Sequence, residues 1–225
     1  PERVIMTAGS SAGLLLVMAL LVDRDQQILL SDPGYPCNRH FVRVLEGEPV
    51  GVPVGPLTNY QLSADLIEAA CSTRTGTQVP PDELRRIAAT CARLGGRLIV
   101  DEIYLGLTYD GPPQTALAIA GEHADDIFVV SSFSKYFNMT GWRLGWVIAP
   151  ERHVRELEKL AQNLYICPPT VSQRAALACF LPGTLALLEE RRRAFGERRD
   201  FLVPALRELG FGIPVQPSGG FFVYA

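Results

Sequence analysis

The chain has 225 residues, of which 48% are hydrophobic and 20% are charged, and these shares exclude a disordered tail, a coiled coil and a collagen-like repeat. A formal net charge of -3 excludes a broad basic field, so we expect no nucleic-acid partner for these residues. The five cysteines are odd in number and scattered, which argues against a disulfide framework or a metal site and favours the reducing cytoplasm.

The first elements alternate short apolar runs with helical stretches. Val4–Thr7 and Gln27–Leu30 are typical of strands, and Ala12–Leu21 is typical of a helix between them. The longest apolar run, Gly13–Val22, is shorter than the roughly 20 residues that span a bilayer, so we expect no membrane association. Gly9–Ser11 lies between strand and helix, where free backbone N–H groups and the helix dipole favour an anion.

Two helices then follow each other with no apolar strand between them. They are expected over Ala64–Cys71 and Asp82–Leu94. Successive helices that pack on a parallel sheet normally have a strand between them. We therefore predict that residues are missing between Arg74 and Gly76. This also predicts a break within Arg74–Thr77, where Cα atoms would lie much farther apart than the ~3.8 Å of a trans peptide.

The middle of the chain returns to the alternating pattern. Strands are predicted over Arg97–Val100, Ile127–Ser131 and Leu144–Ile148, and a helix over Glu151–Leu164. The first two strands are continuous apolar runs, as expected when helices cover both faces of a sheet. Residues 1–183 are thus predicted to form a three-layer α/β/α domain with a mostly parallel sheet.

The pattern changes at Gly183 to one long charged helix, predicted over about Thr184–Leu209. The apolar residues expected to face a core are Leu185, Leu188, Phe195, Phe201 and Leu202. We interpret residues 184–225 as a linking helix and the start of a smaller α+β domain. Both ends of the chain have a strand-like pattern, so we expect Pro1 and Ala225 to be cuts through a larger protein.

The strongest chemical signal is the segment from Ser131 to Gly145. A strand ends in small hydroxyl residues, Lys135 follows in the loop, and Arg143 comes eight positions later. Hydroxyls and a guanidinium around one amine suit a phosphate-bearing carbonyl compound, with which the amine can form a Schiff base. A solvated surface loop is the simpler interpretation, but the four apolar neighbours argue against it: Phe133, Phe137, Met139 and Trp142.

Five motifs in order carry a family resemblance. They are Gly9–Ser11, Asp32-Pro33-Gly34-Tyr35-Pro36, Asp101-Glu102-Ile103-Tyr104, the lysine segment, and Pro217-Ser218-Gly219-Gly220-Phe221-Phe222. The chain resembles the class I/II aminotransferases, which are fold type I pyridoxal 5'-phosphate enzymes. The resemblance implies transfer of an amino group between an amino acid and a 2-keto acid through a pyridoxal phosphate Schiff base on Lys135. It also implies a homodimer.

The resemblance assigns a role to each residue on the cofactor ring. Lys135 is the catalytic base as well as the site of attachment. Asp101 would hold a proton on the pyridine nitrogen, and Tyr104 would hydrogen-bond the phenolic oxygen. Tyr35 would stack on the ring. The resemblance implies no metal.

The phosphate, by the same resemblance, would be held by four residues: Ser10, Ser11, Ser132 and Arg143. The family also has an Asn-Pro-Thr-Gly motif whose asparagine contacts the phenolic oxygen. Here the corresponding residues are Thr73-Arg74-Thr75-Gly76. Either the asparagine has been replaced, or it lies in the segment that we predict to be missing.

Three other interpretations fit parts of the sequence. Gly9 to Gly13 matches the G-x-S-x-G elbow of a Ser-His-acid hydrolase, with Ser11 as nucleophile and His123 or His153 as base. Ser132 to Lys135 matches S-x-x-K of penicillin-interacting enzymes, but the partner motifs do not follow. The third is a cofactor-binding sensor domain of a transcription regulator, because a fold alone does not define an activity.

Overall fold

A computed structural model describes residues 1–70 and 81–225. The predicted break at Arg74–Thr77 and the Thr73–Gly76 motif lie outside the described residues. The strands are β1 (Val4–Thr7), β2 (Gln27–Asp32), β3 (Glu48–Pro53), β4 (Leu98–Asp101), β5 (Ile127–Ser132) and β6 (Gly145–Ile148). The α-helices are α1 (Ser10–Leu21), α2 (Pro36–Val44), α3 (Ala64–Ala70), α4 (Pro81–Arg93), α5 (Ala116–Ile119), α6 (Glu151–Leu164), α7 (Thr170–Leu177) and α8 (Pro182–Glu208).

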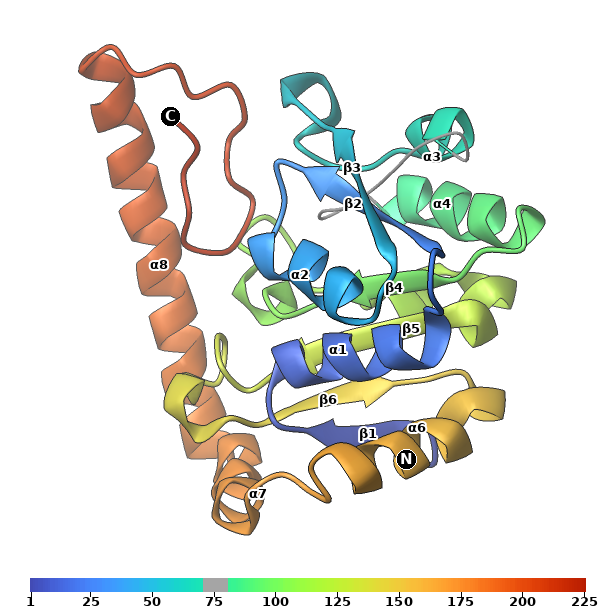
Figure 1. The fold of residues 1–225 in the computed structure, drawn as a ribbon. Helices are drawn as coiled ribbons and strands as arrows, with labels where there is room; N and C mark the ends of the chain where they lie inside the picture. Colours follow the sequence, from blue (N-terminus) through green and yellow to red (C-terminus); the bar gives the residue numbers. More distant parts are fainter. Residues whose placement is uncertain (71–80) are drawn as a thin grey trace.

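A four-stranded mixed sheet in the order β1-β6-β5-β4 forms the centre of the molecule (Figure 1). Strands β4 and β5 are parallel, whereas β6 is antiparallel to both of its neighbours. The sheet therefore has three strands in one direction and one reversed. The reversal arises because the chain leaves β5 and returns into β6 at the same edge through residues 133–144. Strands β2 and β3 form a separate parallel pair.

Helices cover both faces of this sheet, which confirms the predicted α/β/α class. All six residues of β5 are buried. Because side chains alternate along a strand, Phe128 and Val130 face α1 and α6, whereas Ile127 and Val129 face α4 and α5. The apolar runs without polar alternation follow from this burial on both sides.

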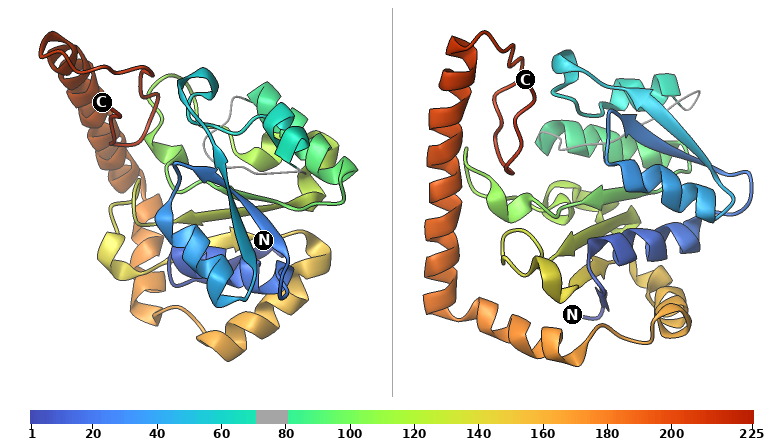
Figure 2. Two further views of the ribbon diagram at one scale, coloured as in Figure 1. Left: turned by 45° about the horizontal axis from the view of Figure 1, so that its top comes forward. Right: turned by 60° about the vertical axis from the view of Figure 1, so that its left-hand side comes forward.

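Helix α8 runs along one side of the molecule, and residues 211–225 turn back beside it (Figure 2). The prediction for its core face was partly wrong. Leu188 is buried, but Phe201 is 77% exposed and Leu202 is exposed as well. The second buried side chain of this helix is Val203. The boundary between two domains near residue 183 remains a prediction.

Within the described residues, we find no individual helix with both the length and the apolar character needed to cross a membrane. The sharply bent pair 170–180 and 182–208 meets those criteria on length and composition only.

Candidate active site

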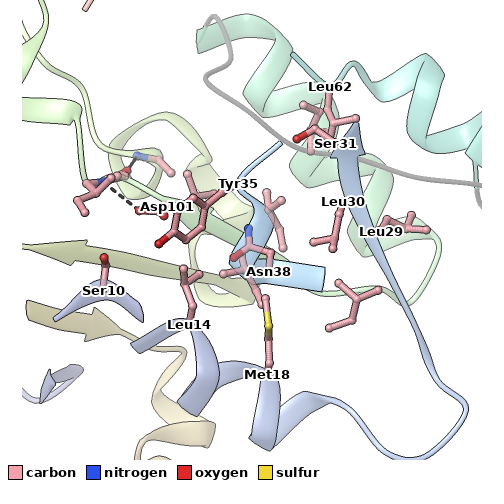
Figure 3. A pocket seen from close by; sticks show the side chains of 18 of the residues that line it. Ser10, Leu14, Met18, Leu29, Leu30, Ser31, Tyr35, Asn38, Leu62 and Asp101 are labelled. Atoms are coloured by element: carbon pink, nitrogen blue, oxygen red, sulfur yellow. Dashed lines mark hydrogen bonds between the residues drawn. The ribbon is translucent and has the colours of Figure 1, made fainter. Parts of the chain in front are cut away.

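A cavity of about 1490 Å³ runs along β2 and β4 and reaches the carboxyl end of β4 and the beginning of α1. Seven of the eight predicted site residues line it: Ser10, Ser11, Tyr35, Asp101, Tyr104, Lys135 and Arg143. They come from four of the five sequence motifs. Figure 3 shows Asp101 beside the Tyr35 ring, with Ser10 and Leu14 of α1 near them. The sheet edge that the sequence indicated is thus the place where these residues meet.

One part of the cavity is built to receive an anion. Helix α1 begins at Ser10, and its cap residue Gly9 has φ 93°, a conformation that side chains rarely adopt. A Cβ on Gly9 would lie 2.6 Å from Nη2 of Arg143. The missing side chain therefore lets the guanidinium approach the free N–H groups of the helix end. Positive charge and helix dipole act together here.

The backbone holds Arg143 in this position. The residue follows η4 (Thr140–Trp142) and has a left-handed conformation with φ 52° and ψ 57°. Its Nη1 donates a hydrogen bond to the Thr140 carbonyl at 3.1 Å, and its Nη2 donates to the Ala8 carbonyl at 3.4 Å. Within the described residues, both hydrogen bonds go to neutral backbone carbonyls. They do not neutralise the guanidinium, so its positive charge is available to a bound anion.

Asp101 ends β4 and is exposed toward the open cavity, while many protein atoms lie around its carboxyl. Oδ1 accepts a hydrogen bond from the Ile103 amide at 3.1 Å. Burial raises the pKa of Asp101 to about 6, and the nearby charge of Glu102 acts in the same direction. A protonated donor on a ligand would relieve the cost of the buried charge.

The adjacent carboxyl, Glu102, serves the fold. It accepts hydrogen bonds from the Thr115 hydroxyl at 2.9 Å and from the Ala116 amide at 2.5 Å. These bonds hold the first turn of α5. Of the acidic pair in the motif, Asp101 is therefore the one whose carboxyl remains available to a ligand.

Lys135 lies at the cavity wall against two aromatic rings that also contact each other, with centres 5.4 Å apart. Its Nζ is 5.7 Å from the centre of the Tyr104 ring and 5.4 Å from that of Phe221. The loop that carries it is held by Phe133 and Met139, which are buried against Ala176 and Cys179 at the end of α7. Two of the apolar residues that argued against a solvated surface loop, Phe133 and Met139, therefore belong to a packing cluster.

Tyr104 and Tyr35 complete the aromatic lining. The Tyr104 ring makes edge contacts with Phe221 and Phe222 from the segment beside α8. Burial, then the charge of Asp101, raises the pKa of the Tyr104 hydroxyl. Tyr35 caps α2 and is 53% exposed, so one face of its ring is free to stack on a planar ligand.

Ser132 is the predicted site residue that does not line the cavity. It is 3% exposed. Its hydroxyl donates to the Leu144 carbonyl at 3.0 Å, and it also accepts the Ser134 amide at 3.0 Å. The structure gives it a bracing role in the lysine loop. The hydroxyls that this loop contributes to the cavity lining belong to Ser134 and Thr140.

Asn38 is a lining residue that sequence reasoning missed. It lies on α2, and its side chain lies close to Tyr35 in Figure 3. Its buried Oδ1 makes no hydrogen bond within the described part of the chain. An unsatisfied buried oxygen at the cavity fits a polar ligand. The third position of a short amphipathic helix carries no sequence signal for such a role.

The geometry argues against the hydrolase interpretation. Ser11 follows the carboxyl end of β1, whereas His153 stacks on Phe128 near the beginning of β5, with ring centres 5.4 Å apart. His123 lies in η3 (Gly121–Asp126), which leads into the same end of β5. Both histidines are therefore at the opposite edge of the sheet from Ser11.

These features define an enzyme-like α/β/α domain with a cavity for a phosphate-bearing aromatic carbonyl ligand. The family model for aminotransferase class I and II matches residues 1–225. The chain belongs to this family. Its members use pyridoxal 5'-phosphate.

Known relatives agree with that membership. A valine–pyruvate aminotransferase of Mycobacterium tuberculosis is 38% identical over 236 aligned residues, covering 100% of this chain and 60% of the relative. A (5-formylfuran-3-yl)methyl phosphate transaminase of Methanocaldococcus jannaschii is 31% identical, with the same coverage. The chain thus spans about 60% of the length of the curated relatives it matches.

Solved structures show the same fold. An aminotransferase from Mycobacterium tuberculosis has a TM-score of 0.88 at 38% identity, covering 98% of this chain and 59% of that one. An aspartate aminotransferase from Thermus thermophilus, described with maleate, has a TM-score of 0.89 at 26% identity, covering 99% and 61%.

The described residues fit pyridoxal phosphate. Arg143 and the beginning of α1 form the anion cradle, and Asp101 is a carboxyl with a raised pKa, suited to a protonated ring nitrogen. Tyr35 offers a ring face, and the Lys135 amine lies in the same cavity. Within the described ranges there is no cluster of His, Cys, Asp or Glu that could hold a metal ion.

Proposed function

We propose that this chain is the cofactor-binding part of an aminotransferase that moves an amino group between an amino acid and a 2-keto acid. The observation that supports it most is one cavity that contains the Lys135 amine, the Arg143 anion cradle and the Asp101 carboxyl. Matching relatives are named for valine, aspartate and arginine as substrates. Their common chemistry is an α-amino acid donor.

Each residue has a distinct task in this reaction. When bound, pyridoxal phosphate supplies an aldehyde that condenses with amines and a ring that accepts electrons. Arg143 and the amides of α1 bind and orient the phosphate. Asp101 holds the proton on the ring nitrogen, which electrostatically favours electron flow into the ring.

Lys135 moves the proton. Its Nζ, when not bound to the cofactor, would accept the proton that leaves Cα of the amino acid and would release it again during the transfer. The Tyr104 and Phe221 rings, which contact each other beside that nitrogen, would exclude water from one side of it. Tyr104 also lines the cavity, where its hydroxyl would orient the phenolic oxygen.

The assembled state that we propose is a cytoplasmic homodimer without a nucleic-acid or membrane partner. The support for self-association is a set of exposed apolar side chains around α7: Ile166 is 78% exposed, Val171 71% and Leu177 62%. The support for the cytoplasm is the scattered cysteine pattern. None of the described cysteines, which are Cys37, Cys91, Cys167 and Cys179, is in a disulfide.

Covalent labelling tests the function directly, because the chain contains two lysines, Lys135 and Lys159. Pyridoxal phosphate and borohydride should place the pyridoxyl label on Lys135. Lys159 lies on α6, paired with Glu156 at 2.7 Å, and serves as the internal control. Lys135→Ala should still bind the cofactor but lose the label and all proton transfer. Equal labelling of both lysines, or full activity of Lys135→Ala, would contradict the proposal.

A further inference from the structure

Three elements meet at Tyr136, the residue after Lys135. Its ring packs on η2 (Leu105–Leu107), the short helix that follows Tyr104. A Cβ on Gly106 would lie 2.6 Å from Cγ of Tyr136, so the ring lies directly against the backbone there. On another side the ring contacts Phe137 edge to face, with centres 5.0 Å apart. The lysine loop and η2 are thus in direct contact through one ring.

The hydroxyl of Tyr136 joins the third element, α8. It donates a hydrogen bond to Oε1 of Glu189 at 2.6 Å. Glu189 in turn pairs with Arg192, Nε to Oε2, at 2.8 Å. Nη1 of Arg192 then donates to the Thr108 carbonyl at 2.8 Å. The chain of contacts begins in the lysine loop, crosses α8 and ends one residue beyond η2.

The proton stays on the tyrosine throughout the physiological range. Burial and the bond to Glu189 raise the pKa of Tyr136 to about 12. That same bond, followed by the contact with Arg192, lowers the pKa of Glu189. A neutral donor facing an ionised acceptor gives a charge-assisted hydrogen bond, which is stronger than one between neutral groups.

The environment of the lysine amine depends on these same elements. The two rings nearest to Nζ, which also contact each other, are Tyr104, directly before η2, and Phe221, from the segment beside α8. That segment is itself tied to the residues after η2, since the Tyr109 amide donates to the Ser218 carbonyl at 2.9 Å. The amine stays in contact with both rings only while the lysine loop, η2 and α8 hold their relative positions.

We propose that Tyr136, Glu189 and Arg192 are positioning residues that hold the Lys135 amine against the Tyr104 and Phe221 rings and directed into the cavity. This inference rests on the proposed function of Lys135. It makes α8, which contributes no residue to the cavity lining, a part of the machinery. It also distinguishes Tyr136 from its neighbours Phe133 and Met139, whose roles are packing.

The first test needs no cofactor. Reductive methylation with formaldehyde and cyanoborohydride, followed by peptide mapping, gives the labelling ratio of Lys135 to Lys159 in the same molecule. Loss of one charge-assisted hydrogen bond in Tyr136→Phe should release the amine and raise this ratio about fivefold. The control is Tyr165→Phe, which removes a hydroxyl with a long 3.5 Å bond to the Met6 carbonyl. Its ratio should equal the parent's.

The second test adds the cofactor. In Tyr136→Phe, pyridoxal phosphate should label Lys135 about fivefold more slowly, while its affinity, measured by tryptophan quenching, stays unchanged. Merely structural damage would weaken both. Glu189→Ala should behave in the same way. Labelling of the double variant should be no slower than that of either single variant, because both substitutions remove the same hydrogen bond.

The outcomes separate this inference from the proposed function. The positioning role would be overturned if Tyr136→Phe had the same methylation ratio as the parent. It would also be overturned if the two single substitutions slowed pyridoxyl labelling by factors that multiply in the double variant. A parent chain that takes no pyridoxyl label at Lys135 would instead contradict the proposed function, and the methylation ratio would still decide whether the three residues hold the amine.

Discussion

Asp101 has a carboxyl that the fold places where its charge is costly. Its neighbours supply one amide hydrogen bond and a second carboxylate, and burial outweighs the amide. Such a group reduces stability and increases the affinity for a protonated ligand. Function and stability therefore oppose each other at this residue, and the two effects can be measured on one variant.

Asp101→Asn is expected to stabilise the cofactor-free chain at neutral pH. The folded-state pKa of about 6 lies above the ordinary aspartate value of 3.8, so the folded state binds the proton more tightly and parent stability falls as pH rises from 4 to 6. Asparagine cannot ionise and avoids that loss. We expect a melting temperature about 2 to 4 °C higher at pH 7, allowing for the open cavity. The difference should vanish near pH 4.

Turnover should move in the opposite direction. In the full-length protein, Asp101→Asn should slow Cα deprotonation by about two orders of magnitude or more, because an amide does not favour the protonated ring. Stopped-flow absorbance with an amino acid donor measures this step. A variant with the parent rate would show that Asp101 does not hold the ring proton.

Gly9 tests the anion cradle. Gly9→Ala places a Cβ 2.6 Å from the Arg143 guanidinium, at a φ of 93°, and should cost about 1 to 3 kcal/mol of stability. It should also abolish the rise in melting temperature that inorganic phosphate gives the parent. The matched control is Gly141→Ala, because a Cβ at Gly141 meets nothing within 4 Å. Its response to phosphate should be that of the parent.

At the scale of elements, helices and strands with a regular hydrophobic pattern were predicted well. Elements whose pattern is interrupted by proline, glycine or polar residues were missed. The predicted ranges of β1 and α6 agree with the observed ones. Strand β3 (Glu48–Pro53) was missed because two prolines and Gly51 interrupt it and Val50 and Val52 are its buried residues. Helix α2 was missed because its histidine, arginines and asparagine conceal a short apolar face.

The candidate site shows the same division. Asp101, Lys135 and Arg143 stand at strand ends, where an α/β sheet gathers ligand-binding residues, so the sequence could indicate them. The approach of Arg143 to Gly9 joins residues 134 positions apart, and the inward turn of Ser132 depends on a hydrogen bond to Leu144. Neither is visible without the packed structure.

Arg199 is one of the residues through which α8 holds the C-terminal segment. Its Nη1 donates to the Pro217 carbonyl at 2.8 Å, and it pairs with Asp110 at 3.1 Å. Arg199→Ala should loosen this segment by about 1 to 3 kcal/mol. Hydrogen exchange should then accelerate at Tyr109 and Gly220 and stay unchanged in β5. Arg198→Ala, an exposed neighbour on the same helix, should leave both regions protected.

At the scale of the whole molecule, the apolar side chains around α7 are expected to be covered by a second copy. Sedimentation of the full-length protein at assay concentration should give a dimer. Leu177→Lys places a charge where 62% of a leucine side chain is exposed, and should shift the equilibrium toward the monomer. A fully active monomer would refute the dimer. The control is Leu209→Lys, at an equally exposed position, 76%, at the end of α8.

The pairing of β1 with β6 has a consequence for biosynthesis. β1 leaves the ribosome before its partner residues, Gly145–Ile148, which follow more than 130 residues later. At about 5 to 20 residues per second, β1 waits about 7 to 28 seconds. The anion cradle cannot form before then, since Gly9 and Arg143 come together through this pairing. Phosphate affinity therefore reports that β6 has joined the sheet, and a nascent chain stopped before residue 145 should lack it.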